Sequence, residues 1–188
     1  VCLPTPFGEI YAFASPSDVL SIEPAYERAM IAEVKALCEA IPHQDLSIQW
    51  DFCHEMLSLD GQPQTQFPPQ GASQPEIVAR MQRLCDAVPP DVELGIHICY
   101  GDFGAKHIIE PKDASRMVDV VNDIVKAVKR RIDYIHFPIP VDRTDRGYVA
   151  RVHPLELWLV AFRLQHPDAS LADAVAASEK ERQEVYRW

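Results

Sequence analysis

The chain has 188 residues, of which 47% are hydrophobic and 24% are charged, and its formal net charge is −10. This composition is ordinary for a folded globular protein, and the acidic balance argues against a nucleic-acid partner, which needs a basic surface. No apolar run is long enough to span a membrane, so we expect no membrane partner. The five cysteines form no Cys-x-x-Cys pair, which favours a reducing, cytoplasmic compartment over a disulfide framework.

Strand and helix patterns alternate along the chain. We expect strands over residues 1–3, 46–53, 92–99 and 132–137, and helices over residues 23–40, 73–88 and 112–131. Between them, residues 58–73 are rich in Gln and Pro and predict a long loop. Residues 155–162 fit either a strand or a helix, and residues 171–187 predict a last helix.

Two helices and one strand have clear local signals. Pro24 is expected in the first turn of its helix, and Asp113 is a plausible N-cap of the helix that follows it. In the second strand, apolar Leu46, Ile48, Trp50 and Phe52 alternate with polar residues, so we predict one buried and one polar face. His54 and Glu55 after this strand are expected to begin a loop, with acid–base catalysis as the less favoured reading.

The alternation predicts an α/β fold with parallel strands joined by right-handed crossovers. In such folds ligands bind at the carboxyl ends of the strands. Three of the expected strands end in carboxyl, imidazole and thiol side chains, among them Asp51, Cys53, His97, Cys99 and His136. The sequence therefore predicts a site at this edge.

His97-Ile98-Cys99 is the most distinctive pattern at that edge. On a strand, residues i and i+2 point to the same face, so the imidazole and the thiol are placed to reach one ion. Zinc binds nitrogen and thiolate sulfur well. The alternative is a histidine and a cysteine that are simply packed and hydrogen-bonded, since free cysteines are often buried.

Two segments carry a family resemblance. His97-Ile98-Cys99-Tyr100 resembles the His-x-Cys-Tyr zinc motif of the cobalamin-independent methionine synthase catalytic domain, and Ile48-Gln49-Trp50-Asp51 resembles a strand of the same family. The wider group includes uroporphyrinogen decarboxylase and shares a (β/α)8 barrel, which typically needs about 250 residues. The resemblance covers roughly residues 1–145. It implies a single partial-barrel domain over residues 1–188 with four or five parallel strands, lacking N-terminal and final barrel strands.

The resemblance also implies roles for individual residues. His97 and Cys99 are the implied zinc ligands, and Asp51 would hold the amino group of a small-molecule substrate. Tyr100, the last residue of the motif, and Asp102, two residues further on, are counted with the substrate-binding residues. The family's glutamate ligand falls at Pro138, so His136 is the candidate third ligand, and no cysteine follows Cys99 to supply the fourth.

The sequence therefore predicts a zinc-dependent, methyltransferase-like enzyme that acts on a thiol or small polar substrate, with a folate as the implied methyl donor. One alternative is a degenerate barrel that serves as a binding or assembly subunit, in which exposed sheet edges favour a homo-oligomer. Another is a metal-free decarboxylase or lyase that uses acids and arginines at the strand ends.

Overall fold

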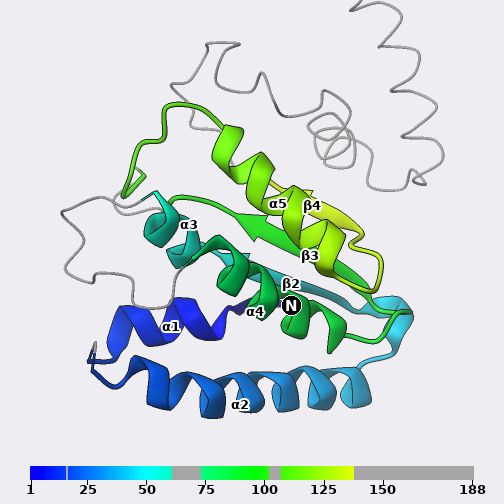
Figure 1. Cartoon of the computed structure of the whole chain (residues 1–188). Helices are drawn as coiled ribbons and strands as arrows, with labels where there is room; N and C mark the ends of the chain where they lie inside the picture. The colour runs from blue at the N-terminus through cyan, green and yellow to red at the C-terminus, as the bar shows by residue number, and fades with distance from the viewer. Residues whose placement is uncertain (16, 61–72, 102–106, 138–188) are drawn as a thin grey trace, which may run out of the picture.

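The computed structural model describes residues 1–15, 17–60, 73–101 and 107–137 (Figure 1). Its elements in chain order are β1 (Cys2–Pro4), α1 (Pro6–Phe13), α2 (Val19–Ala40), a 3₁₀ turn (His43–Asp45), β2 (Ser47–Phe52), α3 (His54–Leu59), α4 (Gln74–Asp86), β3 (Glu93–Ile98), α5 (Ser115–Ala127) and β4 (Tyr134–His136). The segments expected over residues 155–162 and 171–187 lie outside the described residues. Within the described ranges, no helix combines the length and the apolar character that crossing a membrane requires.

The four strands form one parallel sheet in the order β1-β2-β3-β4. Helices connect the sequential neighbours, and side chains of α1, α2, α4 and α5 share one hydrophobic core with the apolar residues of β2 and β3. In Figure 1, α4 and α5 pack side by side in front of the strands. The predicted α/β fold with parallel strands is confirmed, whereas closure into a (β/α)8 barrel stays a prediction.

The predicted alternation in β2 is confirmed. Ile48, Trp50 and Phe52 have no exposed surface, and the residues between them are half-buried. In β3, Leu94, Ile96 and Ile98 are likewise fully buried in the same core. The opposite side, called the polar face below, consists of Ser47, Gln49 and Asp51 of β2, Glu93, Gly95 and His97 of β3, and Tyr134 and His136 of β4.

Helix α4 follows its sequence signals closely. Ser73 is its N-cap, and a capping box links Ser73 to Glu76, with the Ser73 amide donating to Oε2 of Glu76 at 3.1 Å. Its apolar stripe is fully or almost fully buried and consists of Ile77, Met81, Leu84 and Cys85. The helix predicted over residues 73–88 is therefore confirmed to within two residues at its end.

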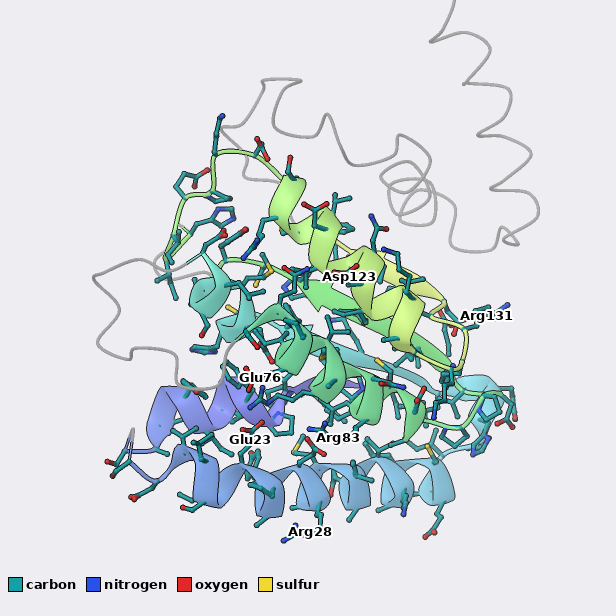
Figure 2. All side chains as sticks on the ribbon, in the orientation of Figure 1. Glu23, Arg28, Glu76, Arg83, Asp123 and Arg131 are labelled. Atoms are coloured by element: carbon teal, nitrogen blue, oxygen red, sulfur yellow. The ribbon has the colours of Figure 1, made fainter. Side chains whose placement is uncertain are left out.

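Ion pairs tie α4 to α2. Arg80 donates to both carboxylate oxygens of Glu23, and Arg83 donates to both oxygens of Glu27 at 2.7 Å. Figure 2 shows Glu23 and Arg83 in the space between these two helices. Bidentate pairs of this geometry fix the relative position of two helices better than single contacts do.

Two expected helix ends are corrected. Helix α2 begins at Val19, so Pro24 lies inside the helix and not in its first turn. Val19 is only 4% exposed, and burial of this one side chain in the extra turn offsets part of the cost of the hydrogen bond that Pro24 cannot donate. Helix α5 ends at Ala127, short of the expected Arg131, because Arg130 donates to the carbonyls of Val88 and Val92 and holds the chain in a loop.

The start of α5 and two short helices also differ from expectation. Ala114, not Asp113, is the N-cap of α5, and the Asp113 carboxylate accepts from the Ser115 amide at 2.8 Å. Helices α1 and α3 were not predicted, because neither is long enough to show a helical period. In particular, His54 and Glu55 begin α3 and not a loop.

Gly95 allows one close approach on the polar face. The Tyr134 ring lies across Gly95, and its hydroxyl reaches the Ser47 hydroxyl at 3.3 Å. A Cβ at position 95 would lie 2.0 Å from Cζ of Tyr134, well inside van der Waals contact. Glycine is therefore required here by the packing of β4 on β3.

We predict that Gly95→Ala lowers the free energy of unfolding by about 1–3 kcal/mol, the usual cost of overpacking. The same substitution in a Tyr134→Ala background should cost much less, because the obstructing ring is gone. Urea unfolding of the four members of this double-mutant cycle measures the coupling. An equal cost of Gly95→Ala in both backgrounds would contradict the packing described.

Candidate functional site

Strand register places three of the predicted site residues in one row across the sheet. Asp51 of β2 is the register partner of His97 in β3, and His97 is the partner of His136 in β4. Register partners in a parallel sheet project to the same side, and all three side chains are half-buried on the polar face. The row lies at or next to the carboxyl ends of the three strands, as predicted.

The two histidines of the row contact each other directly. Nδ1 of His97 lies 2.9 Å from Nδ1 of His136, and the ring centroids are 4.8 Å apart. One of these nitrogens donates and the other accepts. The hydrogen bond with Cys99 raises the pKa of His97, whereas burial, and then the charge of His97, lowers the pKa of His136.

Two cysteines occupy the next position beyond the row. Cys53 and Cys99 follow Asp51 and His97 by two residues each, and their thiols are hydrogen-bonded to each other. The Cys99 amide donates to the Phe52 carbonyl at 3.1 Å, which continues the β2–β3 pairing up to the two cysteines. The sulfur pair is therefore positioned by the same register as the row.

The surroundings of this pair favour a thiolate at Cys99. The hydrogen bond from Cys53 is the largest influence and, with the hydrogen bonds from His97 and the Gly101 backbone, lowers the pKa of Cys99 to about 4 against the opposing effect of burial. The pKa of Cys53 is raised, because this thiol keeps its proton as the donor. Gly101 has φ of 78°, a backbone conformation that favours glycine.

Cys53 is a functional candidate to which the sequence analysis assigned no role. It was expected among the side chains at the strand ends, but the His-x-Cys pattern that singled out His97 and Cys99 does not occur around it. The available signal was the equal offset of two residues from Asp51 to Cys53 and from His97 to Cys99. That signal becomes informative only when Asp51 and His97 are known to be register partners.

Asp51 is oriented from its own strand. Gln49 donates its side-chain N–H to Oδ1 of Asp51 at 2.9 Å, and the same amide nitrogen lies 3.4 Å from Sγ of Cys2. The negative charge of Asp51 adds to the raised pKa of His97 and, at His136, opposes the lowering of the pKa by burial. A half-buried carboxylate held in this way is suited to receive a cationic group.

One of the two other predicted substrate-binding residues, Tyr100, is not brought to the row. Tyr100 has no exposed surface and belongs to the hydrophobic core, with its ring centroid 6.1 Å from that of His107. Because Tyr100 is fully buried in this core, its ring is not accessible to a substrate on the polar face. Asp102 lies outside the described residues.

The donor atoms present fit zinc in kind. His97 offers imidazole nitrogen and Cys99 offers a sulfur that already favours the thiolate form, and both donor types are typical of zinc sites. Over the part of the chain that the structure describes, no three His, Cys, Asp or Glu side chains form a ready-made cluster for a metal ion. The assignments of His97, Cys99 and His136 as ligands therefore stay predictions.

Comparison of the chain with protein-family models, with curated proteins and with solved structures finds no match. The likeness to the methionine synthase family thus rests on the His97–Tyr100 and Ile48–Asp51 segments alone.

A buried acid lies close to Cys53, in the first turn of α3. Glu55 is only 2% exposed, and burial raises its pKa to about 7, although the Thr5 hydroxyl donates to its carboxylate. Thr5 in turn accepts from the Gly8 amide at 3.1 Å as the N-cap of α1. Oε2 of Glu55 has no hydrogen-bond partner among the described residues, so its charge is poorly compensated.

This burial predicts a pH-dependent stability. Because the pKa of folded Glu55 lies above its ordinary value of 4.5, its ionisation costs stability progressively as pH rises from about 4.5 through 7. We expect Glu55→Gln to match the wild type near pH 4.5 and to exceed its free energy of unfolding by about 3 kcal/mol at pH 8. Urea unfolding at several pH values measures the difference.

Glu33→Gln is the matched control for this prediction, since Glu33 is exposed on α2 and the substitution removes the same charge. A gap between Glu55→Gln and the wild type that is independent of pH, or that equals the gap of the control, would contradict a buried, raised-pKa carboxyl.

Proposed function

We propose that this chain is a zinc-dependent enzyme that transfers a methyl group to the thiol of a small polar substrate. The observation that supports this proposal best is the row of Asp51, His97 and His136 on one face of a parallel sheet, with Cys99 directly beyond it. The sequential strand order and the polar face also agree with a (β/α)8 barrel, in which such a face lines the interior. The barrel is part of the proposal.

In this proposal His97 and Cys99 hold the metal. Bound zinc would lower the pKa of a substrate thiol, so that its sulfur is available as a thiolate near neutral pH. Cys53 and the Gly101 amide keep Cys99 deprotonated through their hydrogen bonds, and a deprotonated thiol is the form that can act as a ligand.

Asp51 has a separate role in the proposal. Its carboxylate, oriented by Gln49, would bind a protonated amino group and place the substrate sulfur toward His97 and Cys99. Such positioning lowers the entropic part of the barrier. The substrate thiolate would then form a bond to the methyl carbon of a folate-type donor as the bond from that carbon to the donor nitrogen breaks, and the demethylated folate would leave.

One observation favours a second candidate function. The hydrogen bonds that lower the pKa of Cys99 to about 4 also describe a nucleophilic cysteine next to a histidine. In that case Cys99 itself would attack the substrate without a metal ion. Activity that survives a chelator and disappears in Cys99→Ser would support this second candidate over the first.

We predict that the purified full chain binds close to one zinc ion per molecule. His97→Ala and Cys99→Ala should each weaken binding at least 10²-fold, because each removes a direct ligand. Competition with a chromophoric chelator measures the affinity, and metal analysis after dialysis measures the stoichiometry. Asp51→Asn should retain zinc and lose substrate affinity instead.

Cys38→Ser supplies the control, since Cys38 is a partly buried thiol on α2 that belongs to a different element from the site. Its zinc affinity should equal that of the wild type. Absence of stoichiometric zinc in the wild type would refute the proposed function.

A further inference from the structure

Two thiols meet at the edge of the sheet where the candidate site lies. We propose that Cys53 and Cys99 form a dithiol site that reduces a low-molecular-weight disulfide and becomes an intrachain disulfide in the process. This inference does not rest on the proposed function, because the reaction needs no metal ion. It concerns the chain in which both thiols are reduced.

The strand register places the two cysteines at a distance that a disulfide can span. Phe52 and Ile98 are register partners in β2 and β3. The Cys99 amide donates to the Phe52 carbonyl at 3.1 Å, so the pairing continues one residue further, to Cys53 and Cys99. Neighbouring strands are about 4.8 Å apart, and disulfides join Cα atoms that are about 4.4–6.8 Å apart. A disulfide between the two cysteines therefore fits the backbone that the register provides.

The side-chain contacts agree with this placement. The two thiols are hydrogen-bonded to each other, with Cys53 as the donor and the sulfur of Cys99 as the acceptor. The backbone of Gly101 lies against the same pair, since a Cβ added there would be 3.5 Å from Sγ of Cys53. Both cysteines are only partly buried, and some exposure is what a reactive thiol needs.

The alternative is a pair of cysteines that are simply packed together, since free cysteines are often buried. Cys85 is a residue of that kind, because it has no exposed surface and belongs to the apolar stripe of α4. Cys53 and Cys99 differ from Cys85 in combining partial exposure with contact to a second thiol. These are the two conditions for exchange with an external disulfide, because one sulfur must be attacked and a second must displace the mixed disulfide.

The reaction consists of two exchange steps. The sulfur of Cys99, which accepts the hydrogen bond, attacks one sulfur of the substrate as a thiolate; the substrate S–S bond breaks, and the departing thiolate takes the proton of Cys53. The Cys53 thiolate then attacks Cys99 in the mixed disulfide, which forms the Cys53–Cys99 bond and releases the second thiolate. The two cysteines are oxidised by two electrons and the substrate is reduced by the same two, so no other oxidant is required.

The test treats the reduced full chain with a nitrobenzoate disulfide whose released thiolate is coloured. A chelator is present in every sample, so that no metal ion occupies a thiol. After the remaining thiols have been alkylated, a protease that cleaves after glutamate separates four of the cysteines into residues 34–39, 40–55, 77–93 and 94–110. We expect mass spectrometry to find residues 40–55 joined to residues 94–110 by a disulfide, with no nitrobenzoate retained on either peptide.

Variants assign the roles of the two thiols. Cys53→Ser should retain a nitrobenzoate on Cys99, because no second thiol displaces it. Cys99→Ser should lower the rate of reaction at Cys53 about 10-fold or more, because the attacking sulfur has been removed. Cys38→Ser is the matched control, since Cys38 is a partly buried thiol on α2, and it should form the cross-link at the wild-type rate.

Three outcomes would overturn the inference. They are nitrobenzoate retained on both Cys53 and Cys99 of the wild type, an unchanged rate at Cys53 in Cys99→Ser, and the same yield of this cross-link from a chain unfolded in urea. The zinc content of the chain, measured without a chelator, decides the proposed function separately. Absence of zinc would refute that function and leave the dithiol site in place, and a missing cross-link would do the reverse.

Discussion

The register of three parallel strands is the constraint on which the candidate site depends. Asp51, His97 and His136 meet because β2, β3 and β4 pair without a shift, and Cys53 meets Cys99 for the same reason. Side chains alternate with a period of two along a strand, so a slip of one residue in β3 would turn His97 and Cys99 into the core. The hydrogen bonds of the His97 imidazole and the Cys99 thiol would then be lost together.

The apolar face of the sheet holds that register. Ile48, Trp50 and Phe52 in β2 and Leu94 and Ile96 in β3 have no exposed surface, and burial of each large apolar side chain contributes about 1.5–3 kcal/mol. A slipped strand would expose this set. The residues that hold the polar row in place are therefore its immediate neighbours in the sequence, which pack on the other side of the sheet.

Partial burial determines the pKa of Cys99, which lies directly beyond the row. Fully exposed, the Cys99 thiol would be influenced little by its neighbours, and fully buried it would remain protonated. In between, hydrogen bonds from Cys53, His97 and the Gly101 backbone outweigh desolvation and lower the pKa of Cys99. Glu55 shows the opposite balance. The effect of near-complete burial is larger than that of the hydrogen bond from Thr5, so the pKa of Glu55 is raised to about 7.

The sequence by itself determined the α/β class, the two faces of β2, the capped helix α4 and the presence of polar residues at the strand ends, because these follow from local periodicity and capping. It missed α1 and α3, which are too short to show a period, and it misplaced Pro24, whose cost is partly offset by tertiary burial. Only the tertiary structure decided that His97 contacts His136, that Cys53 joins Cys99, and that Tyr100 belongs to the core. These are contacts between strands or across the sheet, and no local pattern specifies which residues of separate strands become register partners.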